Sequence, residues 1–585
     1  MSTRFFENPE KAIQSRGEDR RCRYTRLICW SVCIGFALLD AWSGRQLIDG
    51  GDGVSYLDMS DALLKHNWHL LINPYWSPVY PFLIGMATWL THPSAYWEVP
   101  IVHVVNFAIF LGALASFEFL LRQVICVLRR ENCRQDADST APLPAWIWQL
   151  LGYSLFAWST FVLIGGLRRV TPDLCVATFV YLDAGLLLRL RTGAKRSRTC
   201  LLLGLTLGFG YLAKTILFPM AFVFMAVAFF VVGKWRKALL PLALTLLLFS
   251  AVAAPLFVSI SRMVGSPSFG ESGSLNYAWL IDGKSPFPFY TSGPPPYLKH
   301  PMNLLHKRPN VFGFEEPEAS TYTLWDNPQY WNAGVSKTFS PRGQLRVIGQ
   351  NLSAFCTDLH MMPMWGLIAG GFIFSIMRPN VPRRFQHILR SWPLFVPGVA
   401  GISVYALVSL QPRYIGSFVV LVLLGLFPEI LLQKSQDTVK RTSIATLVFA
   451  GFMMVFIALN VVYHLAGFPI LRGGGDVHYR AAESLNKEGA RPGDAVALIG
   501  FPYDAVIWAR LARVRIVAQV PPEDASDLWR ASDPRVKAEV YDAFARAGAK
   551  AVITEETPPT DGFADWQRVG DTPYYVHFLA LSRGK

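Results

Sequence analysis

Charged residues are scarce in this sequence of 585 residues. They make up 16% of the chain, compared with roughly a quarter in an average soluble protein. Hydrophobic residues make up 52%, and the mean hydropathy is +0.30. This composition argues against an ordinary cytosolic enzyme and against a disordered, collagen-like or coiled-coil chain. It indicates a protein that is embedded in a membrane over much of its length and also has a water-exposed part.

Cysteine is also scarce, and its spacing forms no pattern. None of the eight cysteines lies after residue 470, and they fall in or beside apolar segments or in cytoplasmic ones. No disulfide framework or zinc site is therefore predicted. His300 and His306 lie six residues apart but belong to no dense ligand set. We predict no cofactor and no metal site, and leave dependence on a divalent metal open.

The net charge of +14 does not point to a nucleic-acid partner. After residue 470 the chain has 15 Lys and Arg against 16 Asp and Glu, whereas the part before it has 40 against 25. The surplus therefore lies in the hydrophobic part, where the orientation of membrane loops explains it better than a DNA-binding face does.

Eleven apolar segments predict membrane-spanning helices, because a helix rising 1.5 Å per residue needs about 20 apolar residues to cross a bilayer. They begin near Leu27, Pro100, Ala145, Pro172, Thr199, Ile216, Ala238, Met361, Ser391, Ile415 and Ser443. Basic residues gather in alternate connections, for example at Arg20, Arg129 and Arg196. The positive-inside rule then places the N-terminus in the cytoplasm, and an odd number of spans places the C-terminus outside.

The predicted domains follow from this topology. Residues 1–26 form a cytoplasmic tail, and residues 27–469 form a transmembrane domain with outer loops at 44–99 and 262–360. Residues 470–585 form an outer α/β domain, because apolar runs shorten there to strand length at 494–500, 515–520, 550–554 and 574–581. A helix is predicted over 533–547, between two of these strands.

The second outer loop, 262–360, is too long for a simple connector and is rich in aromatic residues and proline. It contains FPFYTSGPPPYLKHP and STYTLWDNPQYW. Long irregular segments in compact proteins are usually functional or disordered, and the aromatic density favours order. Two interpretations stay open: a lid that stacks on a sugar, or an aromatic belt that packs onto the membrane surface.

The first outer loop, 44–99, carries four acids directly after the first span: Asp49, Asp52, Asp58 and Asp61. A carboxylate at a membrane surface can act as a general base while its substrate stays in lipid. Asp58 and Asp61 fit one face of a helix, whereas Asp52 is expected to precede that helix, between two glycines that allow close backbone approach. This placement favours Asp52 as the reactive group, with a helix cap as the alternative.

Other charged residues are expected at the same side of the membrane. Arg168, Arg169 and Asp173 lie at the mouth of the fourth span, where Pro172-Asp173 is also an ordinary helix start. Lys214 closes the fifth segment, and Arg413-Tyr414 caps the ninth. Such cations can hold a lipid phosphate by charge-assisted hydrogen bonds, or they can snorkel to the interface.

Asp183 lies about midway through the fourth span, where an ionised group costs about 2.5–3.5 kcal/mol on insertion scales. It is the residue that best supports a rival function, a polytopic lipid or solute transporter. The alternative is that Asp183 is protonated, or hydrogen-bonded to a neighbouring helix, and has no role in transport. A transporter often shows internal repeats and polar residues throughout the membrane depth, and neither is seen here.

The order of these features resembles the GT-C superfamily of glycosyltransferases. The shared features are an N-in first helix, an acid ahead of Tyr56, a short helix ending in WSPVYPFLIG, Pro-Asp at the fourth span, Lys214, QPRYIGSF near the end of the bundle, and a soluble outer tail. The resemblance extends over Thr25–Ala466. It is greatest to the branch containing the protein O-mannosyltransferases, the aminoarabinose transferase of lipid A and the bacterial Rgt-type enzymes.

The resemblance implies a polytopic α-helical enzyme of a bacterial inner membrane, with its C-terminal domain in the periplasm. The implied reaction moves a sugar, by inverting displacement, from a polyprenyl-phosphate donor to a glycan, lipid or protein acceptor on the outer face. Gly53 stands where the family often has a glutamate after the first acid, so a degenerate member that binds polyprenyl lipid without turnover is a further alternative.

Site residues follow from the same resemblance. Asp52 matches the first-loop acid that deprotonates or orients the acceptor, and Asp173 matches the second acid. Lys214 and Arg413 match positions near the donor phosphate, where positive charge stabilises the leaving group. The further predicted substrate contacts are Tyr56, Arg169 and Tyr414.

Overall fold

The computed structural model describes most of the chain. The described residues are 9–48, 50–132, 143–193, 196–233, 235–287, 297–314, 317, 320–376, 391–431, 436–465, 476–500, 506–531, 533–559 and 565–579. The acid Asp49 and much of the first aromatic run of the second loop, at 288–296, lie outside these residues.

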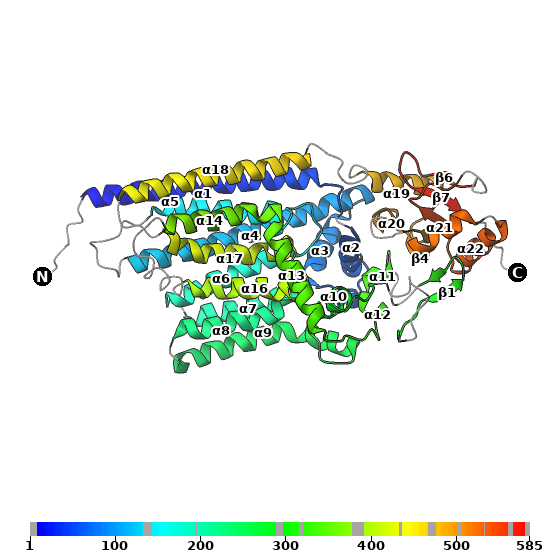
Figure 1. Ribbon diagram of the computed structural model, residues 1–585, viewed down its shortest axis with the longest axis horizontal. Coiled ribbons are helices and arrows are strands. Elements are labelled where there is room, and N and C mark those ends of the chain that lie inside the picture. The colour runs from blue at the N-terminus through cyan, green and yellow to red at the C-terminus, as the bar shows by residue number, and fades with distance from the viewer. Residues whose placement is uncertain are drawn as a thin grey trace.

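A bundle of long helices forms one end of the molecule (Figure 1). Its helices are α1 (Pro9–Ser43), α4 (Ala95–Asn132), α5 (Ala145–Trp158), α6 (Asp173–Arg191), α7 (Arg196–Ala213), α8 (Leu217–Val232), α9 (Trp235–Val264), α14 (Met362–Ile376), α16 (Trp392–Ala406), α17 (Pro412–Leu431) and α18 (Gln436–Leu465). A π-helical turn, η2 (Ser159–Leu163), continues α5. Each apolar segment predicted as a span lies on one of these helices.

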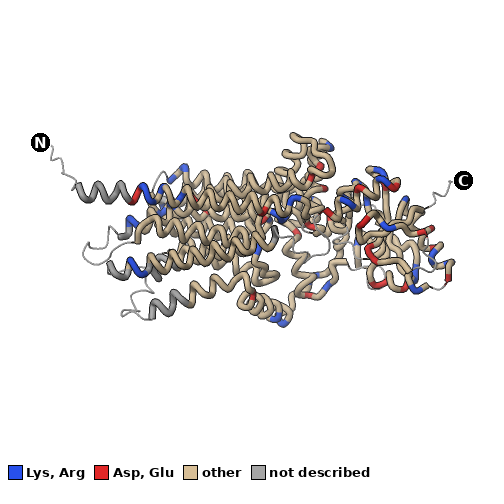
Figure 2. Tube along the Cα trace, turned by 90° about the horizontal axis from the view of Figure 1, so that it is seen from above, with Lys and Arg blue, Asp and Glu red and all other residues tan. Residues whose placement is uncertain are grey.

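Four helical segments of the described chain are long and apolar enough to cross a membrane: Glu18–Ser43, Ala95–Arg130, Ala238–Val264 and Val439–Tyr463. Charged residues are sparse in the middle of the bundle and gather at its two ends, with Lys and Arg prominent at the end near the N-terminus (Figure 2). The structure thus shows a helical protein with candidate membrane spans. The number of spans and the orientation of the bundle stay predictions.

Close helix packing in the bundle depends on small residues. In α7, a Cβ atom on Gly204 would lie 2.4 Å from the carbonyl oxygen of Thr245 in α9, and one on Gly208 would lie 2.6 Å from Val252. Small residues let helix backbones approach closely where no hydrophobic effect drives association, as in lipid.

Short helices of the two long loops cover one end of the bundle (Figure 1). They are α2 (Gly50–Leu64), η1 (Trp68–Leu71), α3 (Val79–Thr91), α10 (Ser272–Leu280), α11 (Thr323–Asp326), α12 (Pro328–Trp331), α13 (Pro341–Thr357) and η3 (Leu359–Met361). Asp52 lies inside the first turn of α2, so the expectation that it precedes the helix is wrong. The reason is that Gly50 and Gly51 already belong to the helix.

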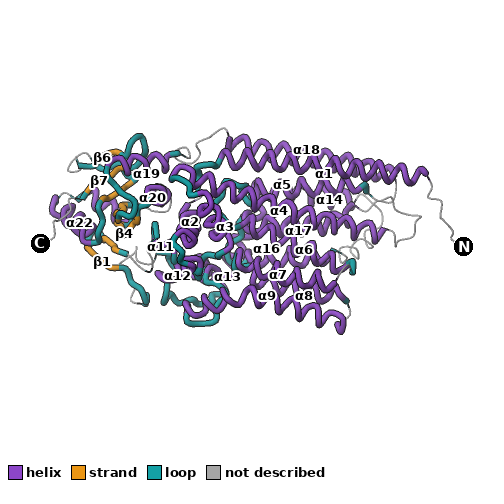
Figure 3. Tube along the Cα trace, turned by 180° about the vertical axis from the view of Figure 1, so that it is seen from behind, coloured by secondary structure: helices purple, strands orange, loops and turns teal. Residues whose placement is uncertain are grey.

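The C-terminal domain is built on a seven-stranded sheet of order β1-β2-β4-β3-β5-β7-β6. The strands are β1 (Asn303–His306), β2 (Val311–Gly313), β3 (Ala495–Ile499), β4 (Arg515–Val520), β5 (Ala551–Thr554), β6 (Gln567–Arg568) and β7 (Tyr575–Phe578). The helices of this domain are α19 (Val477–Glu488), α20 (Val506–Ala512), α21 (Pro522–Arg530) and α22 (Pro534–Arg546). All strands of the described chain lie at the end of the molecule away from the N-terminus (Figure 3).

The four strands and the helix predicted for the tail are confirmed as β3, β4, β5, β7 and α22. Strands β3 and β4 and strands β3 and β5 are parallel, and their continuous apolar runs suit central strands buried on both faces. Asp533 caps α22 by accepting from the backbone N–H of Arg535, with Pro534 in the first turn. Two further strands come from the second loop: β2 pairs with β4, with Phe312 opposite Gln519.

Candidate functional site

Asp52 projects from the first turn of α2 and is fixed by a residue from the distant second loop. Its Oδ1 accepts a hydrogen bond of 3.0 Å from the Trp325 indole, and its Oδ2 lies 3.7 Å from a guanidinium nitrogen of Arg413. The side chain of Asp52 is 18% exposed. The carboxylate is therefore held in place and still reachable.

Gly53 lets α2 approach the segment that leads to Asp173. A Cβ atom at Gly53 would lie 2.5 Å from the Ile48 side chain and 3.1 Å from Cβ of Val170. Both neighbours are buried. A side chain as large as glutamate has no room at this position unless its neighbours shift.

Asp173 and Lys214 form a buried ion pair between the start of α6 and the end of α7. Lys214 Nζ lies 2.6 Å from Asp173 Oδ1, and Thr171 donates to Asp173 Oδ2 at 3.1 Å. The Asp173 side chain is 2% exposed, whereas that of Lys214 is 21% exposed. Asp173 thus lies behind Lys214, and the cation is the member of the pair that solvent reaches.

Tyr414 joins the two cations of the site. Lys214 Nζ lies 4.0 Å from the centroid of the Tyr414 ring, and the Arg413 guanidinium lies 4.8 Å from it. Arg413 also donates to the Tyr414 hydroxyl at 2.9 Å, and the ring stacks on Tyr405 at 5.1 Å. Cation–π contacts of this kind contribute about 0.5–2 kcal/mol each, so Tyr414 helps to hold both positive charges beside one another.

These residues line one cavity of about 490 Å³, which we call the charged cavity. Asp52, Asp173, Lys214 and Arg413 contribute its charges, and apolar residues form a large part of the remaining lining. The apolar residues include Ile216, Pro219, Phe269, Leu280, Leu407 and Val408. The cavity therefore combines two acids and two cations with a surface suited to a hydrocarbon chain.

Two further predicted contacts have different positions. Tyr56 is buried, lines the charged cavity and packs edge-on against Trp76 at 5.2 Å. Burial, reinforced by the negative charge of Asp52, raises the pKa of the Tyr56 hydroxyl well above its ordinary value, so this residue stays protonated. Arg169 is half-buried and is not among the described residues that line the charged cavity, so its role stays a prediction.

Asp183 is buried between two helices, away from the charged cavity. Thr206 of the neighbouring helix α7 donates a hydrogen bond to its Oδ1, and Asp183 is not among the described residues that line the charged cavity. This arrangement matches a hydrogen-bonded acid between helices, and it does not favour the transporter interpretation.

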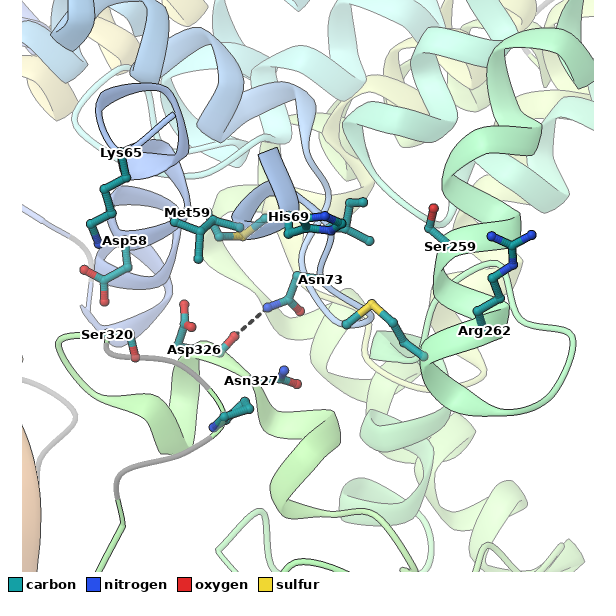
Figure 4. A pocket seen from close by; sticks show the side chains of 14 residues that line it. Asp58, Met59, Lys65, His69, Asn73, Ser259, Arg262, Ser320, Asp326 and Asn327 are labelled. Carbon is teal, nitrogen blue, oxygen red and sulfur yellow. Dashed lines mark hydrogen bonds between the residues drawn. The ribbon is translucent and has the colours of Figure 1, made fainter. Parts of the chain in front are cut away.

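A second cavity, also about 490 Å³, lies beyond a wall built from residues 73–77. Asn73 faces this second cavity, whereas Tyr75, Trp76 and Ser77 face the charged cavity. Asn73 donates to the carbonyl oxygen of Asp326 at 2.8 Å, which ties the wall to the second loop (Figure 4). Its lining mixes apolar residues with polar and charged ones, which include Lys65, His69, Ser259, Arg262, Ser320 and Asn327 (Figure 4).

The sequence analysis missed Trp325 as a site residue, although it singled out the aromatic run that contains it. Trp325 stacks on Trp279 at 6.0 Å, and its carbonyl oxygen accepts from Ser55 and from the Trp76 indole, each at 3.2 Å. Aromatic density signalled an ordered loop, but nothing local links Trp325 to Asp52, which lies 273 residues away. The aromatic run thus contributes to the site itself.

No group of three or more His, Cys, Asp or Glu side chains that could hold a metal ion occurs in the described part of the chain. His306 faces Glu539 of the C-terminal domain at 3.2 Å, and His300 stacks on Tyr330 with ring centroids 3.9 Å apart. Both histidines have protein partners in the second loop or the C-terminal domain.

No protein-family model matches this chain, and no curated protein matches it. Among solved structures, the chain is similar to the oligosaccharyltransferase of Archaeoglobus fulgidus in complex with zinc and sulfate, at 13% identity and a TM-score of 0.44, over 91% of this chain and 67% of that one. It is also similar to ArnT of Cupriavidus metallidurans in the apo state, at 14% identity and a TM-score of 0.39, over 96% of this chain and 98% of that one. The same ArnT bound to undecaprenyl phosphate gives 12% identity and a TM-score of 0.38, over 96% and 99% of the two chains. All three TM-scores lie below 0.5, so these similarities carry no argument about function, which rests on the geometry of the charged cavity.

Proposed function

We propose that this chain is a membrane glycosyltransferase of the GT-C type, which moves a sugar from a polyprenyl-phosphate donor to a hydroxyl acceptor. The observation that carries the proposal is a single cavity that holds the reachable carboxylate of Asp52, the paired cations Lys214 and Arg413, and apolar lining residues. The proposal includes a bacterial inner membrane, a cytoplasmic N-terminus and a periplasmic C-terminal domain.

The cations and the apolar lining residues fit a lipid phosphate. A donor whose isoprenoid chain stays in the bilayer needs positive charge where its phosphate leaves the lipid. Lys214 and Arg413 provide two such charges, both in contact with the Tyr414 ring. A hydrocarbon chain would run along Phe269 and Leu407, which line the same cavity.

Asp52 is the acid best placed to act on an acceptor. Both carboxylate oxygens of Asp173 have partners, Lys214 and Thr171, and the side chain is 2% exposed. Asp52 is more exposed and faces the same cavity. In the proposed reaction Asp52 accepts the proton of the acceptor hydroxyl, whose oxygen attacks the anomeric carbon. The bond from that carbon to the phosphate oxygen breaks, and Lys214 and Arg413 stabilise the leaving phosphate.

The second cavity is the proposed entrance for the acceptor. It lies across the wall of residues 73–77 from the charged cavity, and its polar and charged side chains, such as Lys65, His69 and Asn327, offer hydrogen-bond partners for a hydroxyl-rich molecule. The class of acceptor, whether glycan, lipid or protein, and the identity of the sugar are left open by this chemistry.

Transfer of labelled sugar tests the proposal. The wild-type chain and the variants Asp52→Asn and Asp571→Asn are reconstituted in membranes and given a panel of polyprenyl-phosphate-linked hexoses and pentoses. Asp571 is a matched control, because its 70% exposed carboxylate lies in the C-terminal domain, paired with Arg480. We expect transfer by the wild type and the control, and a loss of about 10²–10⁴-fold in Asp52→Asn, the usual contribution of general acid–base catalysis.

Two results would count against this proposal. Transfer at the wild-type rate by Asp52→Asn would show that Asp52 is not the general base. A wild-type chain that neither transfers sugar nor binds polyprenyl phosphate would refute the proposed function, whereas binding without transfer would identify a degenerate lipid-binding member.

A further inference from the structure

A buried arginine of the C-terminal domain forms ion pairs with the helix that carries Asp52. We infer that Arg510 is a positioning residue that holds α2, and with it Asp52, at the charged cavity. This inference deepens the proposed function and rests on it for its catalytic consequence. The C-terminal domain would then be a working part of the site, because it fixes the position of the acid.

Arg510, on α20, uses its whole guanidinium group in this contact. It donates to Asp58 at 2.8 Å, to Asp61 at 2.9 and 2.7 Å, and to Glu98 at 2.6 and 3.2 Å. These five hydrogen bonds match the five N–H donors of an arginine side chain. Asp58 and Asp61 lie on α2, and Glu98 lies on α4, so one side chain joins three elements.

The charges of this cluster are shielded from water. The side chains of Arg510, Asp58 and Glu98 are 4%, 8% and 2% exposed. Burial acts to raise the pKa of Asp61, but Arg510 and nearby cations bring it below its ordinary value. For Asp58 burial prevails, and its pKa is raised. Without Arg510, Asp58 would lose its cation, and the more exposed Lys65 and Arg513 would remain beside Asp61 and Glu98. Three acids close together in a buried site with too little positive charge are unfavourable unless they take up protons or move apart.

Asp58 also connects Arg510 to the second contact that fixes Asp52. It accepts hydrogen bonds from the backbone N–H and the hydroxyl of Thr321, at 2.9 and 2.8 Å. Thr321 lies four residues before Trp325, whose indole donates to Asp52. The backbone of Thr321 is in turn bonded to Ile516 of β4 at 3.0 Å. The cluster therefore fixes both α2 and the segment that brings the Trp325 indole to Asp52.

The distance along α2 makes this coupling direct. Asp52 precedes Asp58 by six residues, which is about 9 Å along a helix that rises 1.5 Å per residue. A tilt or shift of α2 at Asp58 is thus transmitted to Asp52 through fewer than two helical turns. Lys214 directly follows α7 and Arg413 lies on α17, so other helices carry the donor contacts, although Asp52 lies 3.7 Å from Arg413.

The test compares Arg510→Gln and Arg510→Lys with the matched control Arg513→Gln. Arg513 pairs with Glu98 of α4 at 3.2 Å and is 35% exposed. We expect kcat to fall about 10–100-fold in Arg510→Gln, with the Kd for polyprenyl monophosphate within twofold of wild type. Arg510→Lys keeps the charge but not the fork of donors, so we expect a smaller loss, and Arg513→Gln should stay within threefold of wild type.

Hydrogen exchange supplies a readout that needs no turnover. Amides of α2 and of residues 321–325 should exchange faster in Arg510→Gln, while those of α7 and α17 should be unchanged. If the wild type shows no transfer, the proposed function fails, and hydrogen exchange still tests whether Arg510 holds α2 in place. Unchanged kcat or unchanged hydrogen exchange of α2 in folded Arg510→Gln would overturn the inference. An equal fall in kcat in Arg513→Gln would also overturn it. If Arg510→Gln does not fold, the same criteria apply to Arg510→Lys.

Discussion

Replacing Lys214 by methionine tests whether the charged cavity holds a phosphate through a buried ion pair. The change removes one of two cations and leaves the Asp173 carboxylate, which is 2% exposed, without its partner at 2.6 Å. Breaking a buried ion pair by removing one partner costs about 3–5 kcal/mol. The double variant Lys214→Met/Asp173→Asn removes the stranded charge, so it should be less destabilised than the sum of the two single variants.

Binding of polyprenyl monophosphate gives the second magnitude. A hydrogen bond to a charged group contributes about 1.5–3 kcal/mol, which corresponds to a Kd about 10–150-fold weaker in Lys214→Met. The free energy of unfolding is measured in mixed micelles and the Kd by titration in nanodiscs. Lys487→Met is the control, since Lys487 pairs with Glu483 at 3.1 Å and the two side chains are 71% and 47% exposed, and such surface pairs contribute about 0–1 kcal/mol.

The reasoning is refuted by either of two results. One is a Lys214→Met variant whose unfolding free energy and Kd both equal those of the control. The other is a double variant whose destabilisation equals the sum of the single ones, because the two side chains would then not be coupled.

Three further predictions concern single positions. Gly53→Ala should destabilise the protein by about 1–3 kcal/mol, the usual cost of overpacking, since its Cβ would lie 2.5 Å from a buried side chain; an unchanged melting temperature would contradict this. Trp325→Phe removes the indole donor of Asp52 and should slow transfer about 10-fold or more with donor Kd unchanged; weaker donor binding would argue against a role confined to Asp52. Burial lowers the pKa of His478 to about 4 from 6.5, so the folded protein should lose stability as the pH falls from 6.5 toward 4, by at most about 3.4 kcal/mol. Melting curves of His478→Gln should therefore depend less on pH over this range than those of the wild type or of His66→Asn, an exposed control, and equal pH dependence would contradict the prediction.

Much of the helical and strand structure could be predicted, because local patterns determine it. Apolar runs placed the bundle helices, and short apolar runs placed β3, β4, β5 and β7. The strands β1 and β2 were not predicted, because β2 pairs with β4, about 200 residues further along the chain, and β1 pairs with β2. No local pattern in Asn303–Gly313 reports that partner.

The candidate site shows the same division. Asp52, Asp173, Lys214, Arg413, Tyr414 and Tyr56 were selected from sequence, and the structure brings all six to one cavity. Their individual contacts could not be predicted from sequence. Asp173 lies behind Lys214, and Trp325 and Arg510 contact α2 from distant parts of the chain. Arg510 stands in the tail, where charged residues are ordinary, so only the packing of α20 against α2 distinguishes it.

The most direct test of the central claim is an experimental structure of the protein in nanodiscs with a polyprenyl monophosphate. We predict density for the phosphate between Lys214 and Arg413, within hydrogen-bonding distance of both, and for the isoprenoid chain along Leu407 and Val408. Density for the phosphate in the second cavity, or at the opposite end of the bundle, would contradict the claim that the charged cavity is the donor site.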